Sequence, residues 1–194
     1  RDLRMSRGLG DVYKRQELNS IWEQRLSQVT VQTNNRNDKE KFYGALYRAS
    51  FLPRTFNDVD GRYPSFSTGH PFRQSANGRN YYEDYSMWDT YRALHPLVNI
   101  LTPKKAGDMM QSLVDKYEQG GWLPIFPCWN SYTAAMIGDH CISALGDAYI
   151  KGIRNFDINK ACEGMLRNAF RTPATYEESV SYTHLRAHET CADL

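Results

Sequence analysis

Residues 103–121 read PKKAGDMMQSLVDKYEQGG, a segment that opens with a proline and closes with two glycines. Proline is favoured in the first turn of a helix, and glycine is favoured just past its end. Between these two signals, apolar residues recur at intervals of three and four, which is the period of one helix face. This face contains Ala106, Met109, Met110, Leu113, Val114 and Tyr117. The segment therefore predicts a helix packed against a core.

The same period predicts further helices on both sides of this one. They cover residues 17–33, the segment from Asp38 to just before Pro53, Trp88 to Leu101, Thr133 to Lys151, and the segment capped by Asp157 that ends near Ala169. No segment shows a strand pattern of comparable strength, so we predict an all-α chain. Successive helices joined by short turns favour antiparallel neighbours, as in bundles, α-solenoids or α/α toroids.

Two connections break the pattern of short turns. Residues 53–83 have no helix period, and this connection far exceeds the usual length of about 2–8 residues between helices. It is rich in aromatic and charged residues, as is the loop 121–132 before the next predicted helix. Long connections of this kind are more often functional than filler. We expect both loops to line one pocket together with the start of the helix that contains Trp88.

The length, composition and net charge of the chain limit the classes of protein to which it could belong. The chain has 194 residues, of which 41% are apolar and 24% charged, so it is long and apolar enough for one domain with a buried core. The net charge of +2 is too small to indicate nucleic-acid binding. No apolar run approaches the ~18 residues that span a bilayer. We therefore expect neither a nucleic-acid nor a membrane partner.

The two ends of the chain differ from the rest. Residues 1–16 and 179–194 resemble translated sequencing-adapter sequence, and we expect both ends to be non-native. Between them, residues 17–178 carry equal numbers of basic and acidic residues. His184 and His188 have the spacing of a metal-binding pair, but they lie in the second of these ends and are not interpreted as ligands.

Residues 86–96 read SMWDTYRALHP. Asp89 and Arg92 are three positions apart, as are Trp88 and Tyr91, so each pair shares a helix face. A carboxylate beside an indole suits a sugar, because the carboxylate accepts hydrogen bonds from hydroxyls and the ring covers the apolar C–H face. The alternative is a core tryptophan beside a surface Asp–Arg pair.

Four motifs occur in order: NDVDGRY at 57–63, the segment 86–96, GWLP at 121–124 followed by MIGDH at 136–140, and DAYIKGI at 147–153. In this order and at these spacings the chain resembles the first part of the catalytic domain of glycoside hydrolase family 92, the α-mannosidases. The resemblance runs from about residue 17 to 170.

The resemblance implies a β-sandwich, a linking helix and an α/α toroid, in that order. Residues 17–37 would be the linking helix, and residues 38–178 the first helices of an (α/α)6 toroid. It also implies a calcium-dependent, inverting enzyme that releases terminal mannose from α-mannoside glycans. Such enzymes are expected to be secreted, periplasmic or at the cell surface.

The resemblance further assigns site residues. Trp88 and Asp89 match a pair that contacts the terminal mannose. Asp58, Asp60 and Arg62 match a family motif that could form either part of a pocket or a turn. His140 could have either a structural role or contact the ligand. The predicted substrate-binding residues are Trp88, Asp89, Arg92, Asp58, Asp60, Arg62 and His140.

No catalytic residue is assigned. Inverting hydrolysis needs an acid and a base about 6.5–9.5 Å apart, and in the family these carboxylates and most calcium ligands lie further along the chain. We therefore expect this chain to be inactive alone and to contain no complete metal site. The alternatives are another α/α-toroid glycosidase of the trehalase or glucosidase type, and a non-catalytic helical binding scaffold.

Overall fold

The computed structural model describes residues 2–133, 135–136 and 138–171, with side chains described from residue 12 onward. The chain divides into two compact units, Arg1–Phe51 and Leu52–Leu194. Each is considered by itself.

The first unit is a pair of helices, α1 (Asp2–Leu26) and α2 (Arg36–Arg48). An aromatic cluster joins them: the ring of Trp22 lies 4.5 Å from that of Tyr47 and 6.3 Å from that of Phe51. The hydroxyl of Tyr43 on α2 also donates to the carbonyl of Val29, 2.9 Å away, in the connection between the helices.

The structure corrects the bounds of the helix predicted over residues 17–33, whereas the domain bounds 17–37 stay a prediction. The helix begins upstream of residue 17 and ends at Leu26. The next residues include Val29, Thr30, Val31 and Thr33, and β-branched residues lose side-chain freedom in a helix. Asn35, rather than Asp38, caps α2, because its side chain accepts the backbone N–H of Asn37.

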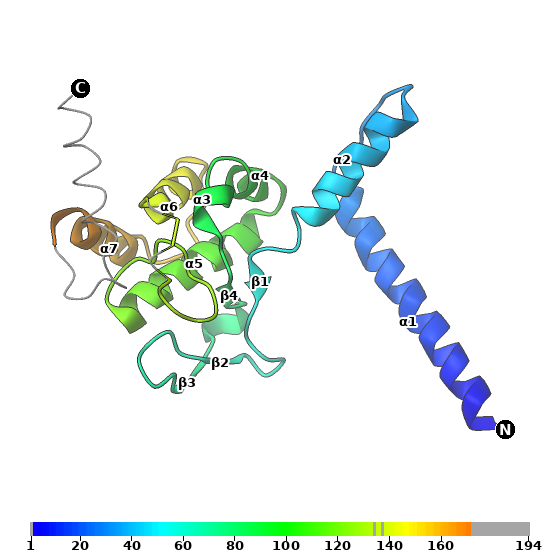
Figure 1. The fold of residues 1–194 in the computed structure, drawn as a ribbon, viewed down its shortest axis with the longest axis horizontal. Helices are drawn as coiled ribbons and strands as arrows, with labels where there is room; N and C mark the ends of the chain where they lie inside the picture. The colour runs from blue at the N-terminus through cyan, green and yellow to red at the C-terminus, as the bar shows by residue number, and fades with distance from the viewer. Residues whose placement is uncertain (1, 134, 137, 172–194) are drawn as a thin grey trace. The chain divides into compact units, whose positions relative to one another are not determined.

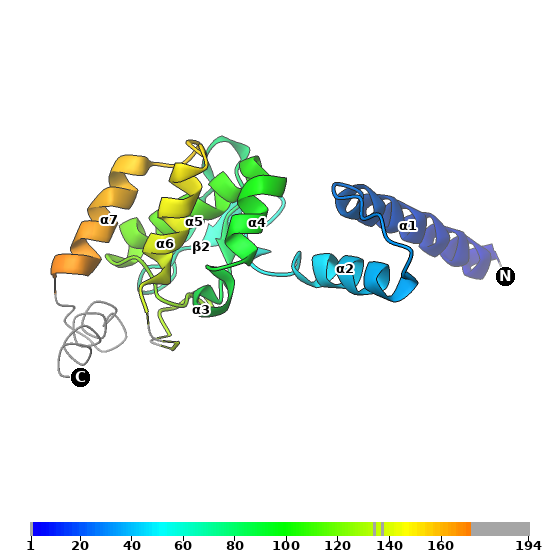
Figure 2. The ribbon, with the colours of Figure 1, turned by 90° about the horizontal axis from the view of Figure 1, so that it is seen from above.

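The core of the second unit is built around α5 (Pro103–Gly120). This helix contacts α4 (Leu94–Leu101), α6 (His140–Ile150) and α7 (Ile158–Phe170), as Figures 1 and 2 show. The predicted apolar face of residues 103–121 is confirmed as buried. Each fully buried Met, Leu or Val side chain stabilises the fold by about 1.5–3 kcal/mol.

The helix expected from Trp88 to Leu101 is broken in two. A short α3 (Met87–Thr90) is followed by a turn, and α4 starts at Leu94. The physical reason is Pro96, which has no backbone N–H and would clash with the preceding turn of a continuous helix. Restarting at Leu94 places Pro96 in a first turn, where its missing donor costs nothing.

The helix expected from Thr133 starts later, at His140. Met136 and Gly138 have φ angles of +54° and +134°, which a right-handed helix excludes. Within the range expected for this helix, Ala134 and Ile137 lie outside the described residues. The helix expected after Asp157 is confirmed, since the Asp157 side chain caps α7 by accepting the N–H of Lys160 at 2.9 Å.

The sequence predicts no strands, but the structure has short strands within residues 53–83. Four short strands lie there: β1 (Arg54–Thr55), β2 (Arg62–Pro64), β3 (Phe72–Gln74) and β4 (Tyr82–Glu83). They form two antiparallel pairs, β1 with β4 and β2 with β3, and a single 3-10 turn covers Ala76–Gly78. Strands of two or three residues give no periodic sequence pattern, and the chain remains predominantly helical, as expected for the first helices of an α/α toroid.

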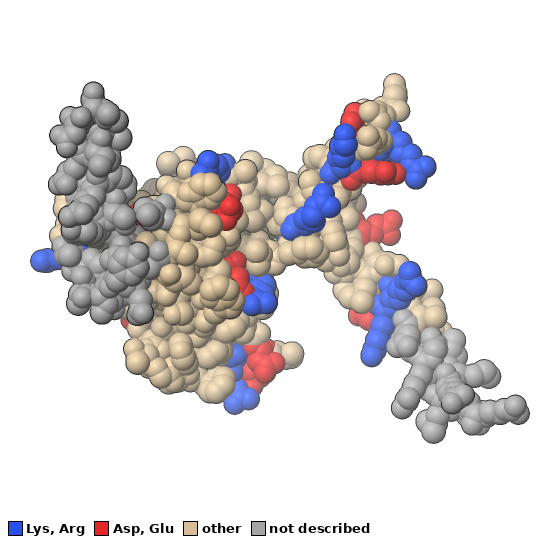
Figure 3. Space-filling model, in the orientation of Figure 1, with Lys and Arg blue, Asp and Glu red and all other residues tan. Residues whose placement is uncertain are grey.

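Two features of the surface bear on partners. Within the part of the chain that the structure describes, no helix has both the length and the apolar character needed to cross a membrane. On the face of the second unit seen in Figure 3, charges of both signs are scattered in small groups without a continuous basic area. The expected non-native end 179–194 lies outside the described residues.

Candidate functional site

A buried ion pair lies where the long connection meets α5. The Nζ atom of Lys116 is 2.6 Å from a carboxylate oxygen of Glu83, and both side chains are fully buried. The same ammonium donates to the carbonyl of Tyr82 at 2.7 Å and lies 4.0 Å from the centre of the Tyr81 ring. Burial lowers the pKa of Lys116, and the charge of Glu83 opposes that change. The pair fixes β4 against α5.

Glu83 and the neighbouring Asp84 bind the backbone of the second long loop, residues 121–132. Glu83 accepts the backbone N–H of Asn130 at 3.2 Å, and Asp84 accepts that of Trp129 at 3.1 Å. The backbone N–H of Tyr85 donates to the carbonyl of Pro127, 3.1 Å away. The loop 121–132 therefore lies along residues 83–85, which lead directly into α3.

The second loop also contacts the first. The side-chain amide of Asn130 donates to the carbonyls of Pro64 and Ser65, at 3.2 and 2.9 Å. The structure thus brings both long loops together beside the approach to α3, as the sequence suggested. A pocket formed by all three segments stays a prediction.

Trp88 and Asp89 lie on the exposed side of α3. The Trp88 side chain is 42% exposed, so it is not the core tryptophan of the alternative interpretation. Asp89 is exposed and accepts a hydrogen bond from the Ser86 hydroxyl at 2.8 Å. Arg92 does not pair with Asp89 in the described part of the chain. Its guanidinium lies 5.0 Å from the ring centres of both Trp88 and Tyr91.

His140 joins this group through Tyr91. The two rings are stacked, with centres 4.2 Å apart and planes inclined by 11°. His140 is the first residue of α6, rather than a position inside a helix as predicted. Four of the predicted residues therefore gather around α3, the turn that follows it and the start of α6, namely Trp88, Asp89, Arg92 and His140.

The other three predicted residues form a turn in the first loop. Asp60 accepts the backbone N–H of Arg62 at 3.0 Å and pairs with its guanidinium at 2.5 Å, and these contacts hold the pKa of Asp60 below its usual value. Gly61 between them has a φ of +82°, which glycine adopts without strain. Asp58 and Arg62 line a cavity of about 390 Å³ with Phe56, Pro64 and Phe72. The turn interpretation is thus supported for Asp60, and a pocket role stays open for Asp58 and Arg62.

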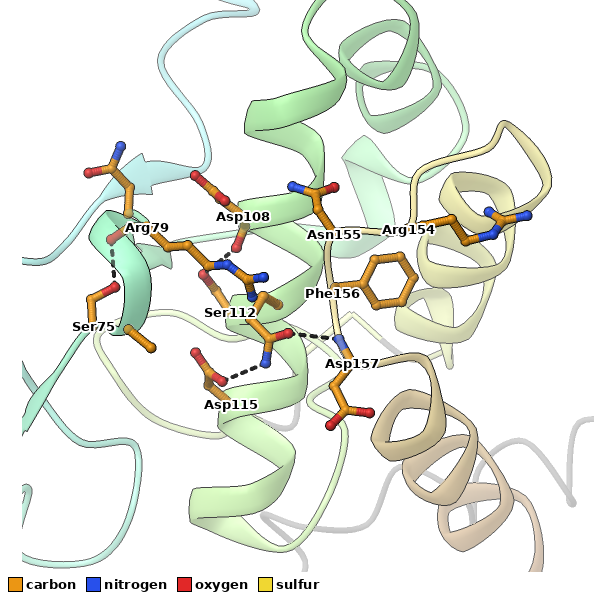
Figure 4. A pocket seen from close by; sticks show the side chains of 12 residues that line it. Ser75, Arg79, Asp108, Ser112, Asp115, Arg154, Asn155, Phe156 and Asp157 are labelled. Carbon is orange, nitrogen blue, oxygen red and sulfur yellow. Dashed lines mark hydrogen bonds between the residues drawn. The ribbon is translucent and has the colours of Figure 1, made fainter.

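A larger cavity of about 430 Å³ lies elsewhere on α5 (Figure 4). Its polar lining includes Asp108 and Asp115 from α5, Arg79 from the first loop, and Asn155 and Asp157 from the loop before α7. Burial raises the pKa of Asp115. None of these residues was predicted as a site residue.

The hydrogen bonds around this cavity give it a structural role. The Gln111 side chain donates to Asp115 at 2.8 Å and accepts the backbone N–H of Asp157 at 2.8 Å. These bonds tie α5 to the start of α7.

Asp139, directly before α6, is a half-buried residue with one enclosed carboxylate oxygen, and the sequence did not single it out. Burial raises its pKa to about 6, and a hydrogen bond from Asn168 partly opposes the rise. Between about pH 4 and 6 the folded chain holds a proton here that the unfolded chain has lost. The contribution of this group to stability therefore falls as the pH rises through that window.

Asp139→Asn is therefore expected to stabilise the chain at pH 7.5 by roughly 1–3 kcal/mol and to give no gain at pH 4, because the amide carries no charge to bury. Urea denaturation at the two pH values measures the difference. Glu118→Gln, at an exposed acid on α5, is the control and should leave stability unchanged at both pH values. An equal effect of Asp139→Asn at pH 4 and 7.5 would contradict the assignment.

Calcium is bound by six to eight oxygen ligands. Within the described residues, no group of three or more His, Cys, Asp or Glu side chains could hold a metal ion. The calcium requirement that the resemblance implies stays a prediction.

Comparisons with known proteins agree with the motifs. The profile of the glycosyl hydrolase family 92 catalytic domain matches residues 12–190. No curated protein matches the chain.

The similar solved structures include the following three. A family GH92 α-mannosidase from Bacteroides thetaiotaomicron shares 32% identity over 80% of this chain and 21% of its own, with a TM-score of 0.74. An inverting family GH92 mannosidase from the VPI-5482 strain of that species shares 28% identity over 84% of this chain and 22% of its own, with a TM-score of 0.75. A further GH92 glycosyl hydrolase shares 22% identity over 82% of this chain and 22% of its own, with a TM-score of 0.63, and shows the fold alone.

The chain spans about a fifth of the length of these solved proteins. The profile match covers nearly all of this chain, and its fold is similar to that of the family members compared above. The chain therefore belongs to glycosyl hydrolase family 92, as part of the catalytic domain.

Proposed function

We propose that this chain is part of an exo-α-mannosidase that releases terminal mannose from α-mannoside glycans by calcium-dependent, inverting hydrolysis. The match to the family's catalytic domain over residues 12–190 carries this proposal. The first α-mannosidase named above has also been solved in complex with mannoimidazole, as a structure with 31% identity to this chain.

The role of the chain is to supply part of the sugar-binding pocket. The exposed Trp88 ring offers an apolar surface for the C–H face of mannose. Asp89, oriented by the Ser86 hydroxyl, offers a carboxylate that accepts hydrogen bonds from sugar hydroxyls. Arg92 lies over the Trp88 ring and fixes its orientation.

The acid, the base and the calcium ligands are proposed to come from other parts of the enzyme. Inverting hydrolysis places a protonated carboxyl on the leaving oxygen and a carboxylate on the attacking water. No carboxyl of this chain is assigned as the acid or the base, and Asp89 is proposed to bind sugar hydroxyls. We therefore expect this chain to be inactive by itself.

The test compares this chain with a full-length enzyme that contains it. We expect the full-length enzyme to release mannose with inverted anomeric configuration, detected by NMR, to lose activity with a calcium chelator and to regain it with added calcium. The 194-residue chain should release none under the same conditions. Release of glucose from trehalose or a glucoside would favour the other toroid glycosidases, and mannose binding without turnover would favour a scaffold.

A further inference from the structure

The second loop presents an aromatic side chain that the core does not need. Trp129 is 80% exposed, and its backbone has a φ of +55°. A bulky residue in the left-handed region is a strained outlier of the backbone. Neither packing nor turn chemistry explains a tryptophan here, because its ring gains little burial in return.

The strained turn is held by buried groups. Asp84 accepts the N–H of Trp129, Glu83 accepts that of Asn130, and Lys116 neutralises Glu83 in the core. Asn130, which also has a φ of +55°, is fixed on its other side by the carbonyls of the first loop. A local conformation persists against strain only when its surroundings over-determine it, and such positions cluster at functional sites.

The turn lies next to the proposed mannose-binding residues. Burial raises the pKa of the Cys128 thiol to about 11, and a hydrogen bond from the backbone of Ser86 partly opposes the rise. Cys128 therefore touches the residue that caps α3. Ser86 itself has a φ of +47° and hydrogen-bonds Asp89. The contact between Cys128 and Ser86 therefore joins the second loop to the segment that contains Trp88 and Asp89. Trp129 is the next residue after Cys128.

We propose that Trp129 is a substrate-binding residue that stacks on the sugar to which the terminal mannose is attached. This proposal rests on the proposed function. An indole offers a broad apolar face for a second pyranose and few hydrogen bonds, so it would bind that sugar without selecting a particular hydroxyl. Trp88 would cover the terminal sugar and Trp129 the next one.

The experiment uses the full-length enzyme with two substrates. An α-mannobiose contains the second sugar, whereas α-mannosyl fluoride replaces it with a fluoride leaving group. Trp129→Ala is expected to lower the ratio of kcat/KM for the disaccharide to kcat/KM for the fluoride about tenfold, mainly through KM. Trp129→Phe should restore most of this ratio, because a smaller aromatic face remains.

Phe170→Ala is the matched control, since Phe170 is a similarly exposed aromatic on α7, and it should leave the ratio unchanged. An unchanged ratio in Trp129→Ala, with the wild type active on both substrates, overturns this proposal alone. Inactivity of the wild type on both substrates overturns the proposed function together with it. Should Trp129→Ala fail to fold, Trp129→Leu takes its place, because leucine keeps apolar bulk but has no flat ring, and an unchanged ratio in Trp129→Leu would also overturn the proposal.

Discussion

Lys116→Met is expected to lower the free energy of unfolding by about 3–5 kcal/mol. The substitution leaves the carboxylate of Glu83 fully buried without its cation, and removing one partner of a buried ion pair costs about this much. Methionine fills a similar volume, so the loss reflects the missing charge and its hydrogen bond to Tyr82 more than a cavity. Urea denaturation followed by tryptophan fluorescence measures the effect.

Lys160→Met provides the matched control. Lys160 is also a helical lysine paired with a glutamate, at 2.9 Å from Glu163, but both side chains are partly exposed. Exposed pairs contribute little to stability, because water and salt screen their attraction, so Lys160→Met is expected to change the free energy of unfolding far less than Lys116→Met. Similar losses in the two variants would show that the Lys116–Glu83 pair is not buried as described.

The helix over residues 103–121 could be predicted because all its signals agree. Start, stop and apolar face are local features, and each follows from the sequence itself. The buried Lys116 left a signal too, since it lies three residues after Leu113 on the apolar face. A charged residue on such a face indicates a buried partner. Its partner, Glu83, follows Tyr81 and Tyr82 at the end of the connection 53–83. Only the fold shows that this carboxylate reaches Lys116.

Other features depend on contacts that no local pattern encodes. The pairing of Asp89 with Arg92 assumed a continuous helix, and the turn before α4 places the guanidinium over Trp88 instead. The late start of α6 follows from left-handed residues at 136 and 138. Likewise, the contact of Asn130 with Ser65 joins residues 65 positions apart. Sequence spacing could therefore nominate the residues near Trp88 but not their geometry.

Asp89→Asn, introduced into a full-length enzyme that contains this chain, is expected to lower kcat/KM for α-mannosides at least about 100-fold. A hydrogen bond to a charged group contributes about 1.5–3 kcal/mol, and an exposed carboxylate can accept two from neighbouring sugar hydroxyls. Asparagine keeps the size of the side chain but replaces one acceptor with a donor, so one of these bonds is lost and the other weakened.

Two further variants separate a sugar contact from a structural effect. Ser86→Ala removes the hydroxyl that orients Asp89 and should lower kcat/KM by a smaller factor of roughly 3–10, in line with the loss of one hydrogen bond. Glu163→Gln, at an exposed acid on α7, should leave kcat/KM unchanged. Activity of Asp89→Asn within about threefold of the wild type would exclude Asp89 from the mannose-binding site, because an uncharged group at that position would then serve equally well.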